Sequence, residues 1–211
     1  MNLNQPLEAD KFYHIYNRGL NSEDLFKEER NYPYFLNKYA EYLSPVIDTY
    51  AYCLLKNHFH LLIRVKSQEK LSEYYRTSRA DKSKEYNEGL HNTDFIVSKQ
   101  FARFFSSYTQ AINKANGRTG SLVETPFKRI EVDSESYITN LIWYIHSNPQ
   151  KHGFVKDYRD YEYSSYQSHL VNNETKLARK QVLEWFGAVD EYEKFHETQK
   201  EEELIRDIII E

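Results

Sequence analysis

Two histidines with one apolar residue between them offer the clearest chemistry in this chain. Residues 57–63 read NHFHLLI, which places His58 and His60 at positions i and i+2. On a strand such residues point to the same face, so the imidazoles would project side by side as half of a site for a divalent metal ion. Two ligands do not complete a site. Taken alone, the pair is better explained as strand histidines that make ordinary hydrogen bonds.

A helix expected over residues 135–147 offers a further ligand and a nucleophile. Tyr144 and Asn148 are four positions apart and share one face of this helix. If that face meets the histidine strand, His58, His60 and Asn148 would bind the ion and Tyr144 would lie beside it. A metal-bound phosphate could then be attacked by the phenolate, which forms a phosphotyrosine.

Each of these residues also has a simpler explanation. Tyr144 is one of 19 tyrosines and could fill a core, whereas Asn148 could end a helix before a proline. Tyr137, two turns earlier on the same face, is the alternative nucleophile. His146 lies on another face of the helix, and we expect it at the surface or in contact with DNA.

The elements that must position these residues alternate along the chain. Apolar patterning predicts strands and helices in the order strand, helix, strand, strand, helix, strand, helix, over residues 12–17, 28–43, 46–55, 58–65, 93–115, 121–132 and 135–147. The first six match a ferredoxin-like split βαβ pattern, of α+β class, with a central antiparallel sheet and helices on one face. In that topology the histidine strand lies beside the first strand, at the centre of the sheet.

Two regions are predicted along the chain. Residues 1–170 would form the domain that carries the site, with a polar insertion or mobile loop at 66–92 that includes a short helix. Residues 171–211 would form a helical, acidic C-terminal extension, with helices at 176–186 and 190–209.

Charge and aromatic content bear on the partner. The net charge is −4, but residues 97–130 hold six basic residues and one acid, whereas residues 195–211 hold six acids and two basic residues. A local basic stretch matters more for phosphate contact than the total charge. The 19 tyrosines and 12 phenylalanines also suit stacking on unpaired bases, although tyrosine commonly fills cores as well. The predicted DNA contacts are Arg18, Lys99, Arg103, Lys114, Arg118, Lys128 and Arg129.

The remaining composition limits the other partners. A single cysteine, Cys53, allows no internal disulfide and no cysteine-rich zinc site, which favours a reducing cytoplasm. The apolar runs are too short to span a membrane. We expect no membrane partner, no organic cofactor, and a monomer or homodimer.

Four short blocks resemble one protein family. They are YHIYNRG at residues 13–19, KNHFHLLI at 56–63, WYIHSNPQKHGFV at 143–155 and YSSY at 163–166. Together they resemble the HUH single-tyrosine transposases, most of all the REP-associated tyrosine transposase branch. The resemblance implies that His58 and His60 are the HUH histidines, Tyr144 the nucleophile and Asn148 the third ligand. It also implies Mg²⁺ or Mn²⁺ as the metal and single-stranded or hairpin DNA as the substrate.

Three functions therefore stand as hypotheses. The leading one is a metal-dependent transposase-like enzyme that cuts and transfers DNA strands through a covalent 5′-phosphotyrosine at Tyr144. A catalytically silent nucleic-acid-binding module on the same fold is the second. The third is a metal-dependent phosphodiesterase without a covalent intermediate.

Overall fold

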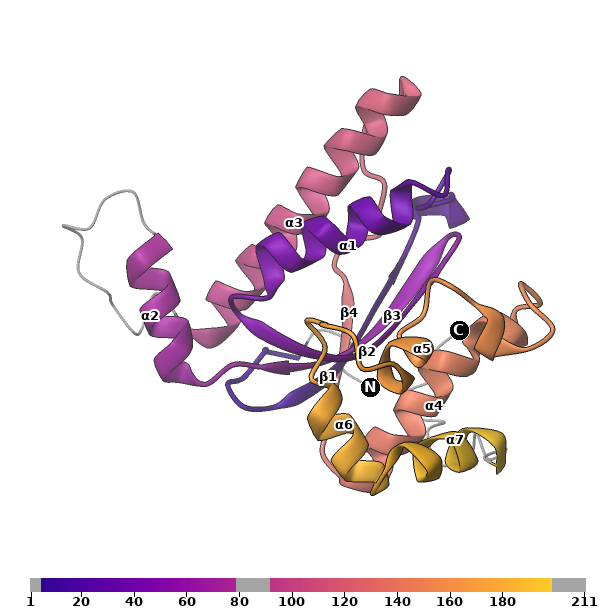
Figure 1. Ribbon diagram of the computed structural model, residues 1–211. Coiled ribbons are helices and arrows are strands. Elements are labelled where there is room, and N and C mark those ends of the chain that lie inside the picture. The colour runs from indigo at the N-terminus through magenta and orange to yellow at the C-terminus, as the bar shows by residue number, and fades with distance from the viewer. Residues whose placement is uncertain (1–4, 79–91, 199–211) are drawn as a thin grey trace.

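A four-stranded antiparallel sheet forms the centre of the protein (Figure 1). The computed structural model describes residues 5–78 and 92–198. The strands are β1 (Phe12–Arg18), β2 (Ile47–Leu55), β3 (His58–Val65) and β4 (Lys128–Val132), and they lie in the order β2-β3-β1-β4. This is the split order expected from the sequence. The predicted place of the histidine strand, next to the first strand at the centre, is confirmed.

Two helices cover one face of the sheet. They are α1 (Asn31–Leu43) and α3 (Thr93–Asn116), and they pack against each other as well as against the sheet. Their apolar residues recur at helical spacing, so that Phe35 and Phe104 reach the core beside Phe59 from β3. The α3 helix begins where the Asn92 side chain accepts a hydrogen bond from the backbone N–H of Phe95, and it ends at Gly117, whose φ is 60°.

The two helices of the split pattern, α1 and α3, lie on one face as predicted, and further helices cover the opposite face. This second layer consists of α4 (Glu135–Lys151), α6 (Arg179–Phe186) and α7 (Val189–Thr198). Both faces of β3 are apolar, because Leu61 and Ile63 point toward α1 while Leu62 points toward α4. A strand buried on both faces needs a layer on each side. The α+β class and the antiparallel sheet are as predicted.

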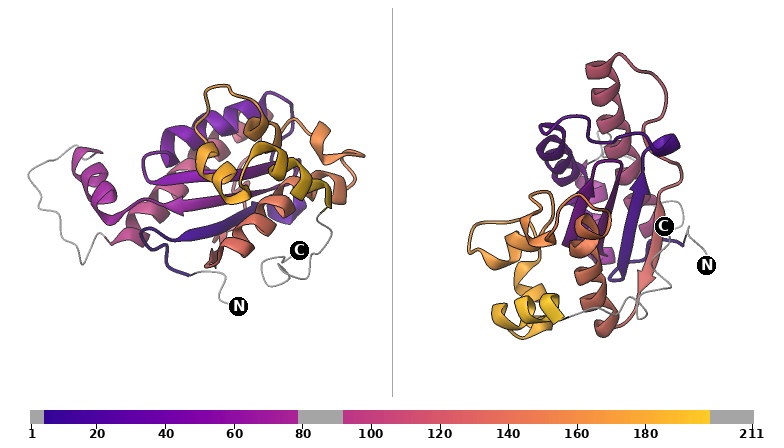
Figure 2. Two further views of the ribbon diagram at one scale, coloured as in Figure 1. Left: turned by 60° about the horizontal axis from the view of Figure 1, so that its bottom comes forward. Right: turned by 90° about the vertical axis from the view of Figure 1, so that its right-hand side faces the viewer.

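The C-terminal helices gather beside α4 in both views of Figure 2. The short α5 (Tyr166–Leu170) and the 3₁₀ turn Tyr158–Asp160 connect α4 to them, and another 3₁₀ turn, Leu20–Ser22, follows β1. The predicted short helix in the polar segment is α2 (Gln68–Ser78); the rest of that segment, 79–91, lies outside the described residues. So does the predicted helical chain beyond Thr198. In the described parts of the chain, no helix combines the length and apolarity needed to cross a bilayer.

Candidate active site

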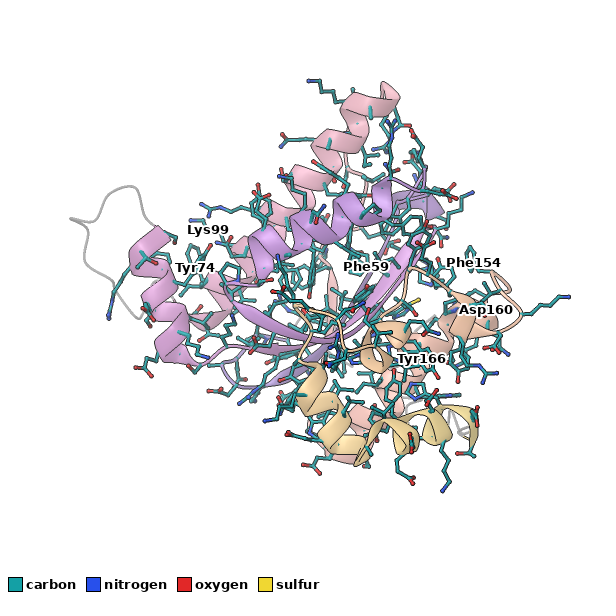
Figure 3. All side chains as sticks on the ribbon, viewed as in Figure 1. Phe59, Tyr74, Lys99, Phe154, Asp160 and Tyr166 are labelled. Carbon is teal, nitrogen blue, oxygen red and sulfur yellow. The ribbon has the colours of Figure 1, made fainter. Side chains whose placement is uncertain are left out.

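The strand register places both histidines on the face of the sheet that α4 covers. His60 lies opposite Tyr16 of β1 on one side and opposite Cys53 of β2 on the other, and His58 lies opposite Arg18. Residues directly opposite each other on antiparallel strands share a face. The intervening Phe59 points the other way, into the space between the sheet and α1 (Figure 3). The predicted pair of imidazoles side by side is therefore present, with ring centroids 5.3 Å apart.

Each histidine ring is held through its Nδ1 atom. For His58 the partner is Oδ1 of Asn57, at 2.7 Å, and for His60 it is Nε2 of His14, at 3.0 Å. A ring held at Nδ1 has Nε2 as its remaining nitrogen for a metal ion. Burial lowers the pKa of His58 to about 4, with the nearby His152 as a second cause, and it lowers the pKa of His60 well below the usual range. Both rings are therefore neutral at pH 7, as a metal ligand must be.

The α4 helix brings its predicted face to these histidines. The ring centroid of Tyr144 lies 5.6 Å from that of His60 and 6.2 Å from that of His14. One turn later, Asn148 donates from Nδ2 to the Tyr144 carbonyl at 2.7 Å. Its Oδ1 atom is buried and accepts no hydrogen bond from the described residues. A buried amide oxygen without a donor calls for an explanation, and a bound cation is one.

The donor set fits a divalent ion that keeps open coordination positions. It consists of the two imidazoles and the Asn148 oxygen, which is a mixed nitrogen and oxygen set. Within residues 5–78 and 92–198, no group of three or more His, Cys, Asp or Glu side chains is arranged to hold a metal ion. A metal centre at this place would therefore need the amide oxygen as well as the two imidazoles.

A pocket of about 370 Å³ opens over the histidines. Besides His58 and His60 it is lined by Tyr16, Arg18, Lys128 and His152, among others. Tyr144 and Asn148 do not line it, and the Tyr144 side chain is only 2% exposed. The ammonium of Lys151 lies over the Tyr144 ring, 4.5 Å from its centroid. The Tyr144 ring is therefore buried, beside the His60 ring and against the Lys151 ammonium.

The seven predicted DNA contacts fall into three groups. Arg18 and Lys128 lie at the pocket, where the Glu124 carboxylate is 2.6 Å from the guanidinium and 3.9 Å from the ammonium. Two others form ion pairs within the fold, because Arg118 bonds to Glu23 and Arg129 approaches Asp94 within 3.4 Å. The last three lie exposed on α3 and are Lys99, Arg103 and Lys114.

Other residues near the site were not assigned roles from the sequence. His14 and Tyr16 alternate on β1, and this alternation is the signal that could have placed them beside His60. His152, one turn beyond Asn148, meets the His58 ring at a centroid distance of 4.9 Å. His146 was expected at the surface and is instead fully buried, because Ser165 and α7 cover that side of α4. Tyr137 packs against the apolar cluster beneath α4.

Comparison with known proteins yields one informative match. No family model matches the sequence, and no curated protein matches it. A solved structure of a REP-associated tyrosine transposase bound to a REP hairpin superposes with a TM-score of 0.55 at 14% sequence identity. The match covers 80% of this chain and 84% of that one. At this identity the likeness establishes a shared fold, which agrees with the family resemblance of the sequence motifs.

Proposed function

We propose that the protein is a transposase-like, metal-dependent DNA nuclease and strand transferase whose nucleophile is Tyr144. The observation that carries the proposal is the position of the Tyr144 ring, 5.6 Å from His60 and one helical turn before an Asn148 oxygen that accepts no hydrogen bond from the residues described. A nucleophile beside an incomplete set of metal donors suits phosphoryl transfer. The shared fold with a tyrosine transposase supports the same class of activity.

The reaction is a transfer between two esters. The Tyr144 oxygen attacks phosphorus, a bond forms between them, and the bond from phosphorus to the 3′ oxygen of the DNA breaks. The 3′ oxygen ends with the proton that the phenol gives up, so the reaction needs no co-reactant. The product is a 5′-phosphotyrosine and a free 3′-hydroxyl, and reversal onto another strand completes the transfer. A Mg²⁺ or Mn²⁺ ion held by His58, His60 and Asn148 would stabilise the negative charge that develops on the phosphate.

Residues at the pocket are suited to hold the DNA strand beside this centre. Arg18 and Lys128 line the pocket and share one partner, the Glu124 carboxylate. A DNA phosphate could replace this carboxylate as the anion between the two cations. Phe154 also lines the pocket and is 43% exposed, which suits stacking on an unpaired base. We propose single-stranded or hairpin DNA as the substrate. The structural neighbour was solved with a hairpin.

The burial of Tyr144 requires a movement before chemistry. Its side chain is 2% exposed, and the Lys151 ammonium lies 4.5 Å from the ring centroid. Lys151 itself is exposed and has a long, flexible side chain, so it can turn toward a DNA phosphate when the strand enters. This movement would bring the phenol and the phosphate together without unfolding α4.

The same burial favours a second candidate function, a nucleic-acid-binding module that cuts nothing. A phenol that never reaches the pocket would leave the cations and the histidines to bind DNA alone. The third hypothesis, hydrolysis without an adduct, needs a water nucleophile and gives no covalent product.

One experiment separates the three. The protein is incubated with Mn²⁺ and hairpin DNA that has a 5′ single-stranded extension and a label at its 3′ end, the part that a 5′-phosphotyrosine retains, and a denaturant-resistant adduct is sought on a gel. The proposal expects an adduct that Tyr144→Phe abolishes and the matched variant Tyr137→Phe retains. An adduct lost only in Tyr137→Phe would move the nucleophile to Tyr137. Cleavage without an adduct would favour hydrolysis, and binding without cleavage would favour the silent module.

A further inference from the structure

Tyr16 lies in the sheet between a proposed metal ligand and a cation. The strand register puts Tyr16 directly opposite His60 of β3 on one side and directly opposite Lys128 of β4 on the other. Residues directly opposite each other on antiparallel strands share a face of the sheet. A DNA strand that extends from a metal ion at His60 toward Lys128 would therefore pass over Tyr16.

Packing holds the Tyr16 ring in place. The ring stacks on the His60 ring at a centroid distance of 5.9 Å and on the His14 ring at 5.0 Å, with interplanar angles of 18° and 29°. The Lys128 ammonium lies over the same ring, 5.7 Å from its centroid. The direction in which the phenol points is therefore set by its neighbours in the sheet.

The Tyr16 hydroxyl differs from other buried phenols of this protein. The hydroxyls of Tyr13, Tyr39 and Tyr108 bond to oxygen atoms of the protein, at 2.8 or 2.9 Å. The Tyr16 hydroxyl is buried too, yet no residue of the described chain offers it a hydrogen bond. Burial also raises the pKa of Tyr16 to about 12, so the phenol keeps its proton at pH 7. A buried donor with no acceptor among the described residues calls for an explanation.

Tyr16 also lines the pocket over the histidines, which Tyr144 does not. The two phenols reach His60 from different elements, since Tyr144 belongs to α4 and Tyr16 to the neighbouring strand. Of the groups in a DNA strand, the phosphate is the one that a metal ion at His60 would bring beside Tyr16. A phosphate bound there would have its nucleophile on the helix and a hydrogen-bond donor on the sheet.

From these observations we infer that the Tyr16 hydroxyl donates a hydrogen bond to a non-bridging oxygen of the phosphate that Tyr144 attacks. Tyr16 would then be a further catalytic residue, because negative charge builds on that oxygen in the transition state and a donor already in place stabilises it. No proton is transferred, so Tyr16 ends the reaction unchanged. This inference rests on the proposed function and adds a contact to the phosphate oxygen that a metal ion does not hold.

A movement of Lys128 would open the hydroxyl to the phosphate. The Lys128 ammonium lies over the Tyr16 ring and is 3.9 Å from the Glu124 carboxylate. A lysine side chain is flexible and can turn toward a DNA phosphate. When a phosphate replaces Glu124 as the partner of Lys128, the side of the Tyr16 ring that the ammonium covers would face the DNA.

The test measures the rate of adduct formation in a single turnover, with Mn²⁺ and the 3′-labelled hairpin. Tyr16→Phe should be about 10²- to 10³-fold slower than the wild type, which is the loss typical of one missing donor to a developing charge. The matched control is Tyr39→Phe, which removes a buried phenol hydroxyl from the other side of the sheet. This control should react at a rate close to that of the wild type.

Stability and binding measurements separate catalysis from a structural role. Tyr16→Phe should be more stable than the wild type in urea, and its affinity for Mn²⁺ should equal that of the wild type. DNA affinity is compared in the Tyr144→Phe background without metal, where nothing is cut, and should also be unchanged. A group that acts mainly in the transition state lowers the rate and leaves ground-state binding intact.

A single sulfur in place of either non-bridging oxygen of the scissile phosphate locates the contact. Sulfur accepts hydrogen bonds more weakly than oxygen, so one of the two stereoisomers should weaken the Tyr16 hydrogen bond in the wild type. Tyr16→Phe has no such bond to lose. That isomer should therefore slow Tyr16→Phe several-fold less than it slows the wild type, as expected for two changes that act on one contact. The other isomer should slow both proteins equally.

Several results would overturn the inference. A wild-type rate in Tyr16→Phe, or sulfur effects identical in the two proteins, would show that the hydroxyl does not contact the scissile phosphate. Lower stability in Tyr16→Phe would mean that the hydroxyl is paired within the protein, and weaker Mn²⁺ binding would mean that Tyr16 positions His60. An adduct that forms in Tyr144→Phe and disappears when Tyr16→Phe is added would make Tyr16 a nucleophile.

The same measurements distinguish this inference from the proposed function. A wild-type protein that forms no adduct would refute both together. A wild-type adduct with an unimpaired Tyr16→Phe would refute the Tyr16 contact alone and leave the nuclease standing.

Discussion

The Nε2 atom of His14 lies 3.0 Å from the Nδ1 atom of His60, across the two central strands of the sheet. Both side chains are buried, and their rings stack at a centroid distance of 5.2 Å. One of the two nitrogens donates a proton and the other accepts it. The bond fixes the orientation of the His60 ring and makes Nε2 the nitrogen that a metal ion can reach.

His14→Ala should therefore weaken metal binding without removing a ligand. Loss of a residue that orients a ligating histidine typically lowers metal affinity by about 10- to 100-fold. Mn²⁺ binding can be followed by calorimetry, with the melting temperature recorded to separate a folding defect. His14→Gln, which can keep one hydrogen bond to His60, should recover part of the affinity. Wild-type affinity in the alanine variant would show that His14 does not orient the ligand.

Removing the Tyr16 hydroxyl should make the protein more stable. The hydroxyl is buried, and no described residue provides it with a hydrogen bond. Because an unpaired buried hydroxyl is destabilising, Tyr16→Phe should raise the free energy of unfolding by about 1 kcal/mol. Tyr39→Phe is the matched control, since the Tyr39 hydroxyl is 2.8 Å from Oγ1 of Thr49, and it should lower stability by about 1 kcal/mol. Urea unfolding measures both, and an equal loss in the two variants would mean that the Tyr16 hydroxyl is paired in solution.

Local periodicity was enough to predict which of the candidate side chains are neighbours within one strand or one helix. Spacings of two on a strand and four on a helix placed His58 beside His60 and Tyr144 one turn before Asn148, because those geometries depend on the backbone alone. The order of the strands followed from the alternation of strands and helices. The split pattern then fixed which strand lies beside the histidines.

Long-range packing accounts for what the sequence did not reveal. The ion pair of Arg118 could not be predicted because its partner, Glu23, is 95 positions away in the chain. His146 looked exposed because it points away from Tyr144, yet α7 returns from far along the chain to cover it. The sequence also did not predict that α4 covers the second face of the sheet. Local sequence patterns do not specify which face of a sheet a helix packs against.

Gly19 occupies a position where no side chain fits. A Cβ atom there would lie 1.8 Å from the carbonyl oxygen of Glu23, and the Gly19 N–H donates to the Asn57 carbonyl at 2.7 Å. Gly19→Ala should lower the free energy of unfolding by about 3 kcal/mol, because backbone atoms must shift. Gly117→Ala is the comparison: its φ of 60° is strained for alanine but its surroundings are open, so about 1 kcal/mol is expected. Thermal melts that rank Gly117→Ala as the more damaging change would contradict this account.

A chain of hydrogen bonds between buried histidines joins α4 to the C-terminal extension. Nδ1 of His196 lies 2.8 Å from the carbonyl oxygen of Tyr192, which can only accept, so this nitrogen carries the proton. Nε2 of His196 then accepts from Nδ1 of His146 at 3.0 Å, and Nε2 of His146 accepts from the Ser165 hydroxyl at 2.7 Å. Every bond in the chain is satisfied with both rings neutral. A second proton on His196 would force His146 to carry its proton on Nε2 instead of Nδ1, and Ser165 to donate to the Tyr52 carbonyl at 3.3 Å instead of to His146.

Acid should therefore loosen the docking of α7 on α4. Burial lowers the pKa of His196 to about 3, that of His169 to about 4 and that of His146 well below its usual range. Below pH 6.5 these histidines bind protons in the unfolded chain but stay neutral in the folded chain. The free energy of unfolding should therefore decrease as the pH is lowered from about 6.5 toward 4. The decrease is at most about 1.4 kcal/mol per pH unit for each histidine. Above about pH 7.5 these groups should contribute no slope. Urea titrations between pH 4.5 and 8 measure the slope of the free energy of unfolding against pH. The variant His196→Gln, whose amide can keep both hydrogen bonds, should remove the contribution of one histidine to that slope. A slope unchanged by that substitution would show that His196 takes its proton without disturbing the fold.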